Sequence, residues 1–385
     1  METIYLNWAA TSAQKPKTVI DTAVRFLKEN HDLNLHRALP GVSDGFQILA
    51  VREAVNDFFG GPASANVIFT PNVTTSLNMI LHGLLEHGRK TVLTTPLEHN
   101  SVLRPLALLE DAGKITVRYL PMDEAGELRL EDAKEMLTAD VDLLVMNHAS
   151  NVLGTIQPIG ELFARAKAQG ILTVLDAAQT AGFLPIDMKM QSIDYLAFTG
   201  HKSLLGLAGS GGFVLGAGME KHLAPWLAGG TGSASELLTM PDFLPDKYEP
   251  GTPNTLGILS LGAGIQALQE MDYLQVAEHE RSLTQQFLAG LAGLPLRVLG
   301  PGADHADELV PVVSVVPEHA DPAELGQALF EKYGVITRSG LHCAPLAHRL
   351  AGTLATGALR FSFGYATTEE EIALTLKAIH ELLPN

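Results

Sequence analysis

The chain has 385 residues, of which 46% are hydrophobic and 18% are charged. This balance supports a sizeable packed core and excludes an intrinsically disordered protein. The formal net charge of -17 argues against nucleic-acid and anionic membrane-surface partners, because an acidic surface repels phosphate groups. No run of about 18 consecutive apolar residues is present, so no membrane span is predicted.

The N-terminal residues and the cysteine content favour a cytoplasmic protein. No basic segment followed by an apolar run opens the sequence, so no secretory signal is expected. Cys343 is the only cysteine, which excludes an internal disulfide and a multi-cysteine zinc site. No HExxH or similar paired-ligand spacing occurs, and we therefore expect no metal site.

Short apolar runs alternate with helical patterns through the first two thirds of the chain. Their length and their Val, Ile and Leu content are typical of buried strands. We expect these strands at 65–70, 91–94, 115–119, 142–147, 172–175, 195–198 and 212–215. Helices are expected between them, among others at 74–88, 102–112 and 159–169. The alternation predicts an α/β fold with a mostly parallel seven-stranded sheet flanked by helices.

The pattern changes after Gly251-Thr252-Pro253-Asn254. A long helical pattern follows from about 255 to 291. Strands are then expected at 310–316, 335–337 and 358–362, and helices at 322–333 and 369–382. This order predicts a smaller α+β C-terminal domain on a connecting helix. We expect a large domain at 15–255 and a small domain formed by 1–14 and 256–385.

A lysine follows a predicted buried strand in the segment Phe198-Thr199-Gly200-His201-Lys202. Most lysines are solvated surface residues. This one lies at the end of an apolar strand and before the glycine-rich segment 204–212. A lysine held there can form a Schiff base with a carbonyl cofactor.

Asp176 directly follows another apolar strand, at 171–175. Ligands of open α/β sheets bind beyond the carboxyl ends of the strands. A carboxylate in that place can pair with a protonated pyridine nitrogen and strengthen the ring as an electron sink. A helix N-cap is the alternative interpretation of Asp176.

The segment Asn72-Val73-Thr74-Thr75-Ser76 lies between a predicted strand and a predicted helix. A helix N-terminus offers free backbone N–H groups, and the hydroxyls of Thr74 and Ser76 can complete a phosphate cup. A simple capping turn is the alternative, and no P-loop pattern is present. The cup, the acid and the lysine occur in that order along one α/β domain. Together they indicate a pyridoxal-phosphate site.

The predicted small domain contributes a thiol and a guanidinium. Cys343 is a candidate nucleophile, because cationic neighbours favour the thiolate. Its basic sequence neighbours are Arg338, His342, His348 and Arg349. Arg360 lies in an apolar strand, where a guanidinium needs an anion, and a substrate carboxylate suits its fork. The alternatives are a buried structural cysteine and an internal salt bridge of Arg360.

At these residues the chain resembles the class V branch of fold-type I pyridoxal-phosphate enzymes, and within it the cysteine desulfurases of the short-loop type. The most specific motifs are LDAAQTAG at 175–182, TGHKSLLG at 199–206 and SGLHCAP at 339–345. The similarity runs from Tyr5 to the segment 360–367, nearly end to end. Where the family usually has Asp followed by Asn or Ser, this chain has Asn7-Trp8, in a segment that borders the substrate pocket of relatives.

The resemblance implies a role for each matching residue. Lys202 would carry the cofactor and later a proton, with Asp176 at the pyridine nitrogen and Gln179 at the ring hydroxyl. The implied cofactor-binding residues are Val73, Thr74, His99, Asn151, Asp176, Gln179, Thr199, His201, Lys202 and Thr252. The implied catalytic residues are Lys202, Cys343 and His99. The implied substrate-binding residues are Asn151, Arg338 and Arg360. Thr252 would reach the phosphate of a partner subunit, which implies a homodimer with shared active sites.

The implied reaction converts L-cysteine to L-alanine and leaves a persulfide on Cys343 for a sulfur-acceptor protein. A class V aminotransferase, a selenocysteine lyase or a related pyridoxal-phosphate β-lyase would use Lys202 and Arg360 equally well. Cys343 favours the desulfurase over the aminotransferase, because transamination has no use for a thiol. A nicotinamide enzyme is a further alternative, since 262–267 contains GxGxxA, but packing of a helix explains that segment better. A non-catalytic protein of this fold would be expected to lack the lysine or the acid.

Overall fold

The computed structural model describes residues 3–29, 44–86 and 90–383. Its large sheet has seven strands in the order β2-β8-β7-β6-β5-β3-β4. The strands are β2 Val67–Thr70, β3 Lys90–Thr94, β4 Ile115–Tyr119, β5 Leu143–Asn147, β6 Leu172–Asp176, β7 Tyr195–Thr199 and β8 Gly211–Leu215. β8 runs antiparallel to both neighbours and the remaining pairs are parallel. The expected mostly parallel seven-stranded sheet is confirmed.

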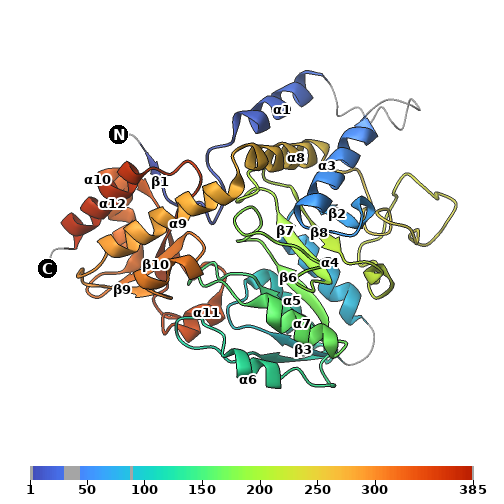
Figure 1. The fold of residues 1–385 in the computed structure, drawn as a ribbon, viewed down its shortest axis with the longest axis horizontal. Helices are drawn as coiled ribbons and strands as arrows, with labels where there is room; N and C mark the ends of the chain where they lie inside the picture. Colours follow the sequence, from blue (N-terminus) through green and yellow to red (C-terminus); the bar gives the residue numbers. More distant parts are fainter. Residues whose placement is uncertain (1–2, 30–43, 87–89, 384–385) are drawn as a thin grey trace.

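Helices cover both faces of this sheet, and two hydrophobic cores result (Figure 1). One core takes side chains from α3 Asp44–Phe58, α7 Ile159–Ala168 and α8 Thr255–Glu270. The other takes side chains from α4 Val73–Leu85 and α5 Asn100–Asp111. Successive residues of β7 alternate between the cores, as strand geometry requires. Two further helices of this half are α1 Lys17–Lys28 and α6 Leu130–Glu135, and the short 3-10 turns are η2 Ser64–Asn66 and η3 Met219–Lys221.

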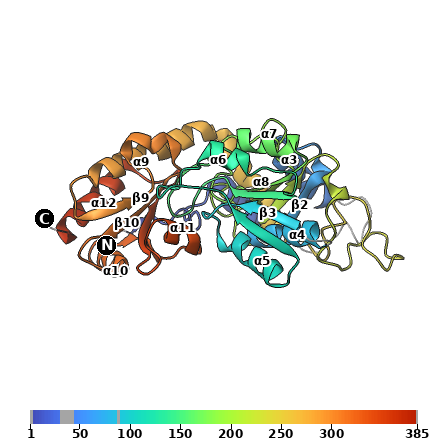
Figure 2. The same cartoon turned by 90° about the horizontal axis from the view of Figure 1, so that it is seen from below.

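The C-terminal third forms an antiparallel sheet in the order β12-β13-β10-β9. Its elements are α9 Tyr273–Gly290, β9 Leu296–Leu299, η4 Ala303–Glu308, β10 Val312–Pro317, α10 Pro322–Tyr333, β11 Val335–Ile336, β12 Arg338–Gly340, α11 Pro345–Leu350, β13 Ala358–Ser362 and α12 Glu369–Leu382. β1 Ile4–Tyr5 pairs in parallel with β11 in a separate two-stranded sheet, and Asn7 forms a bridge to Ser362 in β13, which brings the N-terminal segment to the four-stranded sheet. Both chain ends therefore lie at one end of the molecule (Figures 1 and 2).

The helical pattern at 255–291 is not one helix. It is divided into α8 and α9 at Asp272, which has a left-handed φ of 55°. A left-handed residue does not continue a right-handed helix. The Asp272 carboxylate also accepts a hydrogen bond from the Leu274 N–H, so it caps the start of α9. The predicted end of the helix at 74–88 lies outside the described residues.

The GxGxxA segment lies inside α8, as the packing interpretation expects. A Cβ on Gly264 would lie 2.1 Å from the Leu204 carbonyl oxygen, and one on Gly262 would lie 2.6 Å from Val51. Gly264 lets α8 approach the loop that follows Lys202, and Gly262 lets it approach α3. Within the described ranges, none of the helices combines the length and the apolar character that crossing a bilayer requires.

Candidate functional site

Lys202 and Asp176 come from neighbouring parallel strands. Asp176 ends β6, and Lys202 follows the end of β7. Burial raises the pKa of Asp176, while the Ala178 N–H and the Lys202 amine act against this rise. Burial lowers the pKa of Lys202 to about 8, against the opposing effect of Asp176. A neutral, nucleophilic amine is therefore accessible close to neutral pH.

A cavity in front of Lys202 collects residues from five separate segments. Six of the residues named from the sequence line it, namely Val73, His99, Asn151, Asp176, Gln179 and Lys202. The other lining residues are Ser101, Asn147, Ala149 and Ala178. The sequence predicts that these six residues belong to one site, and in the fold all six line one cavity.

The phosphate-cup segment forms the start of α4. The Asn72 Oδ1 accepts a hydrogen bond of 2.9 Å from the Thr75 N–H, so Asn72 is the N-cap. Thr74 is exposed in the first turn. The expectation for Ser76 is wrong, because its hydroxyl is buried and pairs with the Thr70 hydroxyl at 2.8 Å. Ser76 thus joins the helix to β2 and is not directed at a ligand.

Thr199 and His201 flank the Lys202 turn. The Thr199 hydroxyl is buried and has no hydrogen-bond partner among the described residues. The His201 Nδ1 pairs with the Thr11 hydroxyl at 3.0 Å, and burial lowers the pKa of His201 to about 4. Thr252 is exposed and lines a different cavity, beside the ion pair between the buried Arg52 and the partly buried Glu249. Its role toward a partner subunit stays a prediction.

His99 is the N-cap of α5. Its Nδ1 accepts a hydrogen bond of 3.1 Å from the Ser101 N–H. Burial, and next the charge of Lys202, lower the pKa of His99 to about 4. The ring is therefore neutral at neutral pH, and with Nδ1 acting as an acceptor its proton lies on Nε2.

Arg360 is 1% exposed in β13 and has only neutral partners. Its Nη1 donates to the Asn151 carbonyl at 3.0 Å and its Nη2 donates to the Asn7 Oδ1 at 3.1 Å. Its Nε is buried without a partner, and no carboxylate of the described residues pairs with the guanidinium. Burial, and next Arg338, lower the pKa of Arg360 to about 9. The alternative of an internal salt bridge therefore lacks its acidic partner in the described part of the chain.

Cys343 is exposed in the loop between β12 and α11. The Arg338 Nη2 lies 3.9 Å from the Cys343 Sγ. The Cys343 carbonyl accepts a hydrogen bond of 2.7 Å from the Asn100 N–H, next to His99. The Asn151 amide donates at 2.7 Å to the carbonyl of His342. These bonds attach the cysteine loop to the cavity that contains Lys202.

The expected cationic surroundings of Cys343 are only partly present. His342 and His348 are buried, and burial lowers their pKa values to about 3 and about 4. Both rings are neutral at neutral pH, so the expectation that they act as cations is wrong. Arg338 supplies a positive charge at the sulfur.

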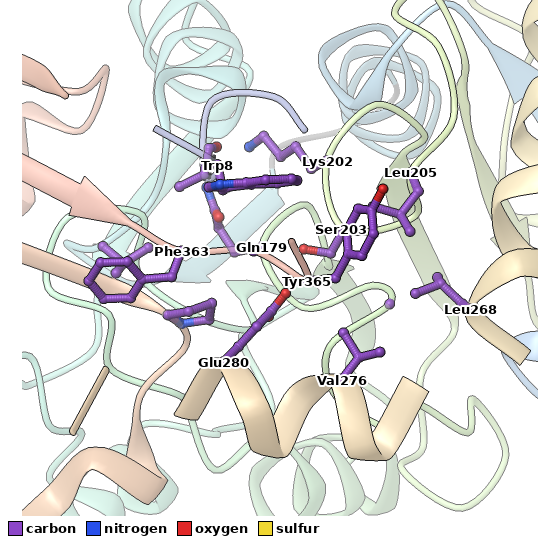
Figure 3. Close-up of a pocket in the computed structure, with 15 residues that line it drawn as sticks. Trp8, Gln179, Lys202, Ser203, Leu205, Leu268, Val276, Glu280, Phe363 and Tyr365 are labelled. Atoms are coloured by element: carbon purple, nitrogen blue, oxygen red, sulfur yellow. Dashed lines mark hydrogen bonds between the residues drawn. The ribbon is translucent and has the colours of Figure 1, made fainter. Parts of the chain in front are cut away.

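Sequence reasoning missed several residues around Lys202. Asn147 ends β5 in register with Asp176, so the strand-end argument that identified Asp176 could have identified it too. Glu98 is fully buried, and burial raises its pKa to about 8. A second cavity adjoins Lys202 and Gln179 and is lined by Trp8 and Glu280 among others. Figure 3 shows Lys202 and Trp8 at one end of it and Glu280, from α9, at the other. In the described part of the chain, no group of three or more His, Cys, Asp and Glu side chains could hold a metal ion.

Comparison with known proteins identifies relatives along most of the chain. Residues 4–374 match the family described as aminotransferase class V. A cysteine desulfurase of Yersinia pseudotuberculosis is 32% identical over 350 residues, which cover 89% of this chain and 84% of the relative. A cysteine desulfurase of Yersinia pestis is 31% identical over 351 residues, with the same coverage.

Solved structures agree with this similarity. The apo cysteine desulfurase of Thermococcus onnurineus NA1 has a TM-score of 0.90 and 29% identity, covering 99% of this chain and 94% of that one. The cysteine desulfurase CsdA of Escherichia coli has a TM-score of 0.88 and 25% identity, covering 99% of this chain and 95% of that one.

Proposed function

The chain belongs to the aminotransferase class V family, among its cysteine desulfurases, and on this premise we propose the role of each site residue in the reaction. Pyridoxal 5′-phosphate is held on Lys202, and the substrate is L-cysteine. The products are L-alanine and a persulfide on Cys343, which an acceptor protein receives. The observation that supports this proposal most directly is the meeting of Lys202, Asp176 and the Cys343 loop around one cavity.

The residues of this cavity fit the cofactor. The Lys202 amine has no hydrogen bond or ion pair within the described residues, and the buried Thr199 hydroxyl is likewise without a partner. Asp176 offers an anion for a ring nitrogen at the strand end, and Gln179 lies beside it. Val73 and Thr74 at the start of α4 would lie at the phosphate, with Thr199 and His201. When bound, pyridoxal phosphate supplies a ring that accepts electrons from the substrate α-carbon.

The chain's own residues then position the substrate and move its protons. The Arg360 guanidinium binds the α-carboxylate, because it is charged and buried and has only neutral partners among the residues that the structure describes. Asn151 holds Arg360 through its carbonyl and the cysteine loop through its amide. The neutral Lys202 amine removes the α-proton and can deliver a proton to the β-carbon, which completes the methyl group of alanine. A second proton, taken up from solvent by the same amine, returns to the α-carbon and restores the α C–H bond of alanine.

Cys343 receives the sulfur. Its thiolate attacks the substrate sulfur, an S–S bond forms and the C–S bond of the substrate breaks. The electron pair of the broken bond remains with the carbon that becomes the alanine methyl group. Arg338 lies beside the sulfur, with its Nη2 3.9 Å from the Cys343 Sγ. The exposure of Cys343 lets an acceptor protein reach the persulfide.

The test is a product analysis of cofactor-loaded protein given L-cysteine and a reductant. We expect alanine and sulfide in equal amounts, and we expect Cys343→Ala to lose both while it keeps the cofactor absorbance. Cofactor binding without either product would overturn the desulfurase assignment. Transamination, selenide release and β-elimination would then be measured with other amino acids.

The same proposal includes a homodimer with shared sites, a two-domain division and a cytoplasmic location. Thr252 of each subunit would reach the phosphate at the other subunit's Lys202. Separate hydrophobic cores under the seven-stranded and four-stranded sheets support a large domain at 15–255 and a small domain of 1–14 with 256–385. α8, at the start of the second unit, packs into the core of the first. The single free cysteine suits a reducing compartment.

A further inference from the structure

Beneath the cysteine loop, two imidazoles and a hydroxyl form a buried hydrogen-bonded chain. The His342 Nδ1 lies 3.3 Å from the His348 Nε2, and the His348 Nδ1 lies 2.8 Å from the Thr353 Oγ1. At the other end, the His342 Nε2 lies 3.0 Å from the Arg338 carbonyl oxygen. All three side chains are buried, and the two rings lie edge to edge, with their centroids 5.5 Å apart and their planes 20° from parallel.

The direction of each hydrogen bond in this chain is fixed. A carbonyl oxygen only accepts, so the His342 Nε2 carries a proton and donates to Arg338. In a neutral ring the His342 Nδ1 must then accept, which requires the proton of His348 to lie on Nε2. The His348 Nδ1 accepts in turn from the Thr353 hydroxyl. One arrangement of protons satisfies every group, so each ring fixes the tautomer of the next.

This chain supports a strained backbone at the nucleophile. His342 and Cys343 have left-handed φ angles of 50° and 59°, and neither is glycine. Such residues keep this conformation only where their surroundings hold them in it. The His342 ring ties the residue before Cys343 to Arg338, whose guanidinium reaches the Cys343 sulfur. The position of the thiol relative to its cation therefore depends on the ring of His342.

We propose that His348 is a positioning residue for the sulfur-transfer step. Its Nε2–H holds His342 in the orientation that keeps Cys343 in its left-handed conformation, with the sulfur beside Arg338. His348 touches neither the Lys202 cavity nor the thiol, so it acts through His342. This inference rests on the proposed function, because it assigns His348 to the step in which Cys343 accepts sulfur.

Three substitutions of His348 separate the hydrogen bond from the packing. His348→Phe keeps a ring and removes the donor. His348→Gln places an amide N–H at the reach of the imidazole Nε2, and His348→Asn carries the same amide one methylene shorter. We expect Phe and Asn to lower kcat about tenfold to a hundredfold, the range for a misplaced reacting group, and Gln to restore most of it. KM for L-cysteine should stay unchanged, because Arg360 keeps its partners.

A second measurement needs neither cofactor nor turnover. Iodoacetamide alkylation of Cys343 in cofactor-free protein should be slower in the Phe and Asn variants at pH 7, because the thiol leaves Arg338, and close to wild type in Gln. The proposal would be overturned if His348→Phe and His348→Asn had the same kcat and alkylation rate as wild type. It would also be overturned if His348→Gln and His348→Phe lost kcat equally. Cofactor absorbance and thermal unfolding show which variants are folded. If His348→Phe does not fold, the comparison of His348→Gln with His348→Asn tests the proposal. If wild-type protein forms no alanine, the proposed function fails, while the alkylation rates still test the positioning.

Discussion

Arg338 and Arg360 are register partners in the antiparallel pair β12–β13, so two guanidinium groups lie opposite each other on one face of the small sheet. Like charges directly opposite destabilise a ladder. Each described hydrogen bond of the Arg360 guanidinium goes to a neutral oxygen, and burial, and next Arg338, lower its pKa. An anion beside Arg360 relieves this repulsion, and a substrate carboxylate has the matching geometry.

Arg360→Lys should therefore raise KM for L-cysteine more than it lowers kcat. The ammonium keeps the charge and loses the fork, and a charge-assisted hydrogen bond contributes about 1.5–3 kcal/mol, or about tenfold to a hundredfold in KM. Steady-state kinetics on cofactor-loaded protein give the two constants. Arg349→Lys, on the exposed face of α11, is the matched control and should behave as wild type. An unchanged KM in Arg360→Lys would remove Arg360 from the substrate site.

Two buried carboxyl groups close to the site should respond differently to amide substitution. Asp176→Asn removes the anion that we propose for the ring nitrogen, and we expect a loss on the order of a hundredfold in kcat or more. Glu98 is buried and its pKa is raised to about 8, first by burial, so at pH 7 it is already largely neutral. Glu98→Gln keeps that neutral shape, including an acceptor for the Thr95 hydroxyl and the Asn147 N–H, and should keep most of the activity. Similar kcat values for both variants at pH 7 would contradict these charge assignments.

Attachment of the cofactor should follow the charge of Lys202. Burial lowers the pKa of this amine to about 8, and attack on a carbonyl needs the neutral form. The rate at which cofactor-free protein takes up pyridoxal phosphate should rise with pH and become constant above about 8. Absorbance follows the reaction, and borohydride reduction followed by mass spectrometry locates the modified residue. Lys202→Ala should show no covalent attachment, and a rate that keeps rising to pH 10 would exclude the lowered pKa.

Acid should destabilise the protein through buried neutral histidines. His148 is 4% exposed and pairs with the Thr180 hydroxyl, and burial lowers its pKa from 6.5 to about 4. Between pH 6.5 and pH 4, the His148 side chain binds a proton in the unfolded chain but not in the folded chain. The contribution of His148 to the free energy of unfolding is therefore fully present above pH 6.5 and is lost as the pH falls toward 4. Full protonation of this one group costs about 3 kcal/mol.

Denaturant unfolding between pH 7 and pH 4 measures this effect. His148→Gln should show a shallower fall in the free energy of unfolding, because one titrating group is gone. His319→Gln, the same substitution at an exposed histidine, is the matched control. Equal slopes for His148→Gln and wild type would show that His148 does not resist protonation.

The local elements follow from short-range patterns, and this is why they could be predicted. Each apolar run between glycine or polar turns became a strand of the large sheet, because its side chains have to be buried on both faces. The break at Asp272 was missed, since the apolar pattern continues across it and only a left-handed residue with a capping carboxylate divides the helix. Ser76 was misjudged because a hydroxyl in a helical turn can face a ligand or a neighbouring strand, and the sequence is the same in both cases.

The sequence by itself determined the fold class, the lysine and the acid at strand ends, and the position of the thiol in a loop, because motif spacing and strand ends are local properties of the chain. Only the tertiary structure decided the rest. It gave Arg360 only neutral partners among the described residues, opposed it to Arg338, and brought Asn7 to its guanidinium from 353 residues away. It also made His342 and His348 neutral, because the charge of an imidazole depends on burial by segments that are distant in sequence.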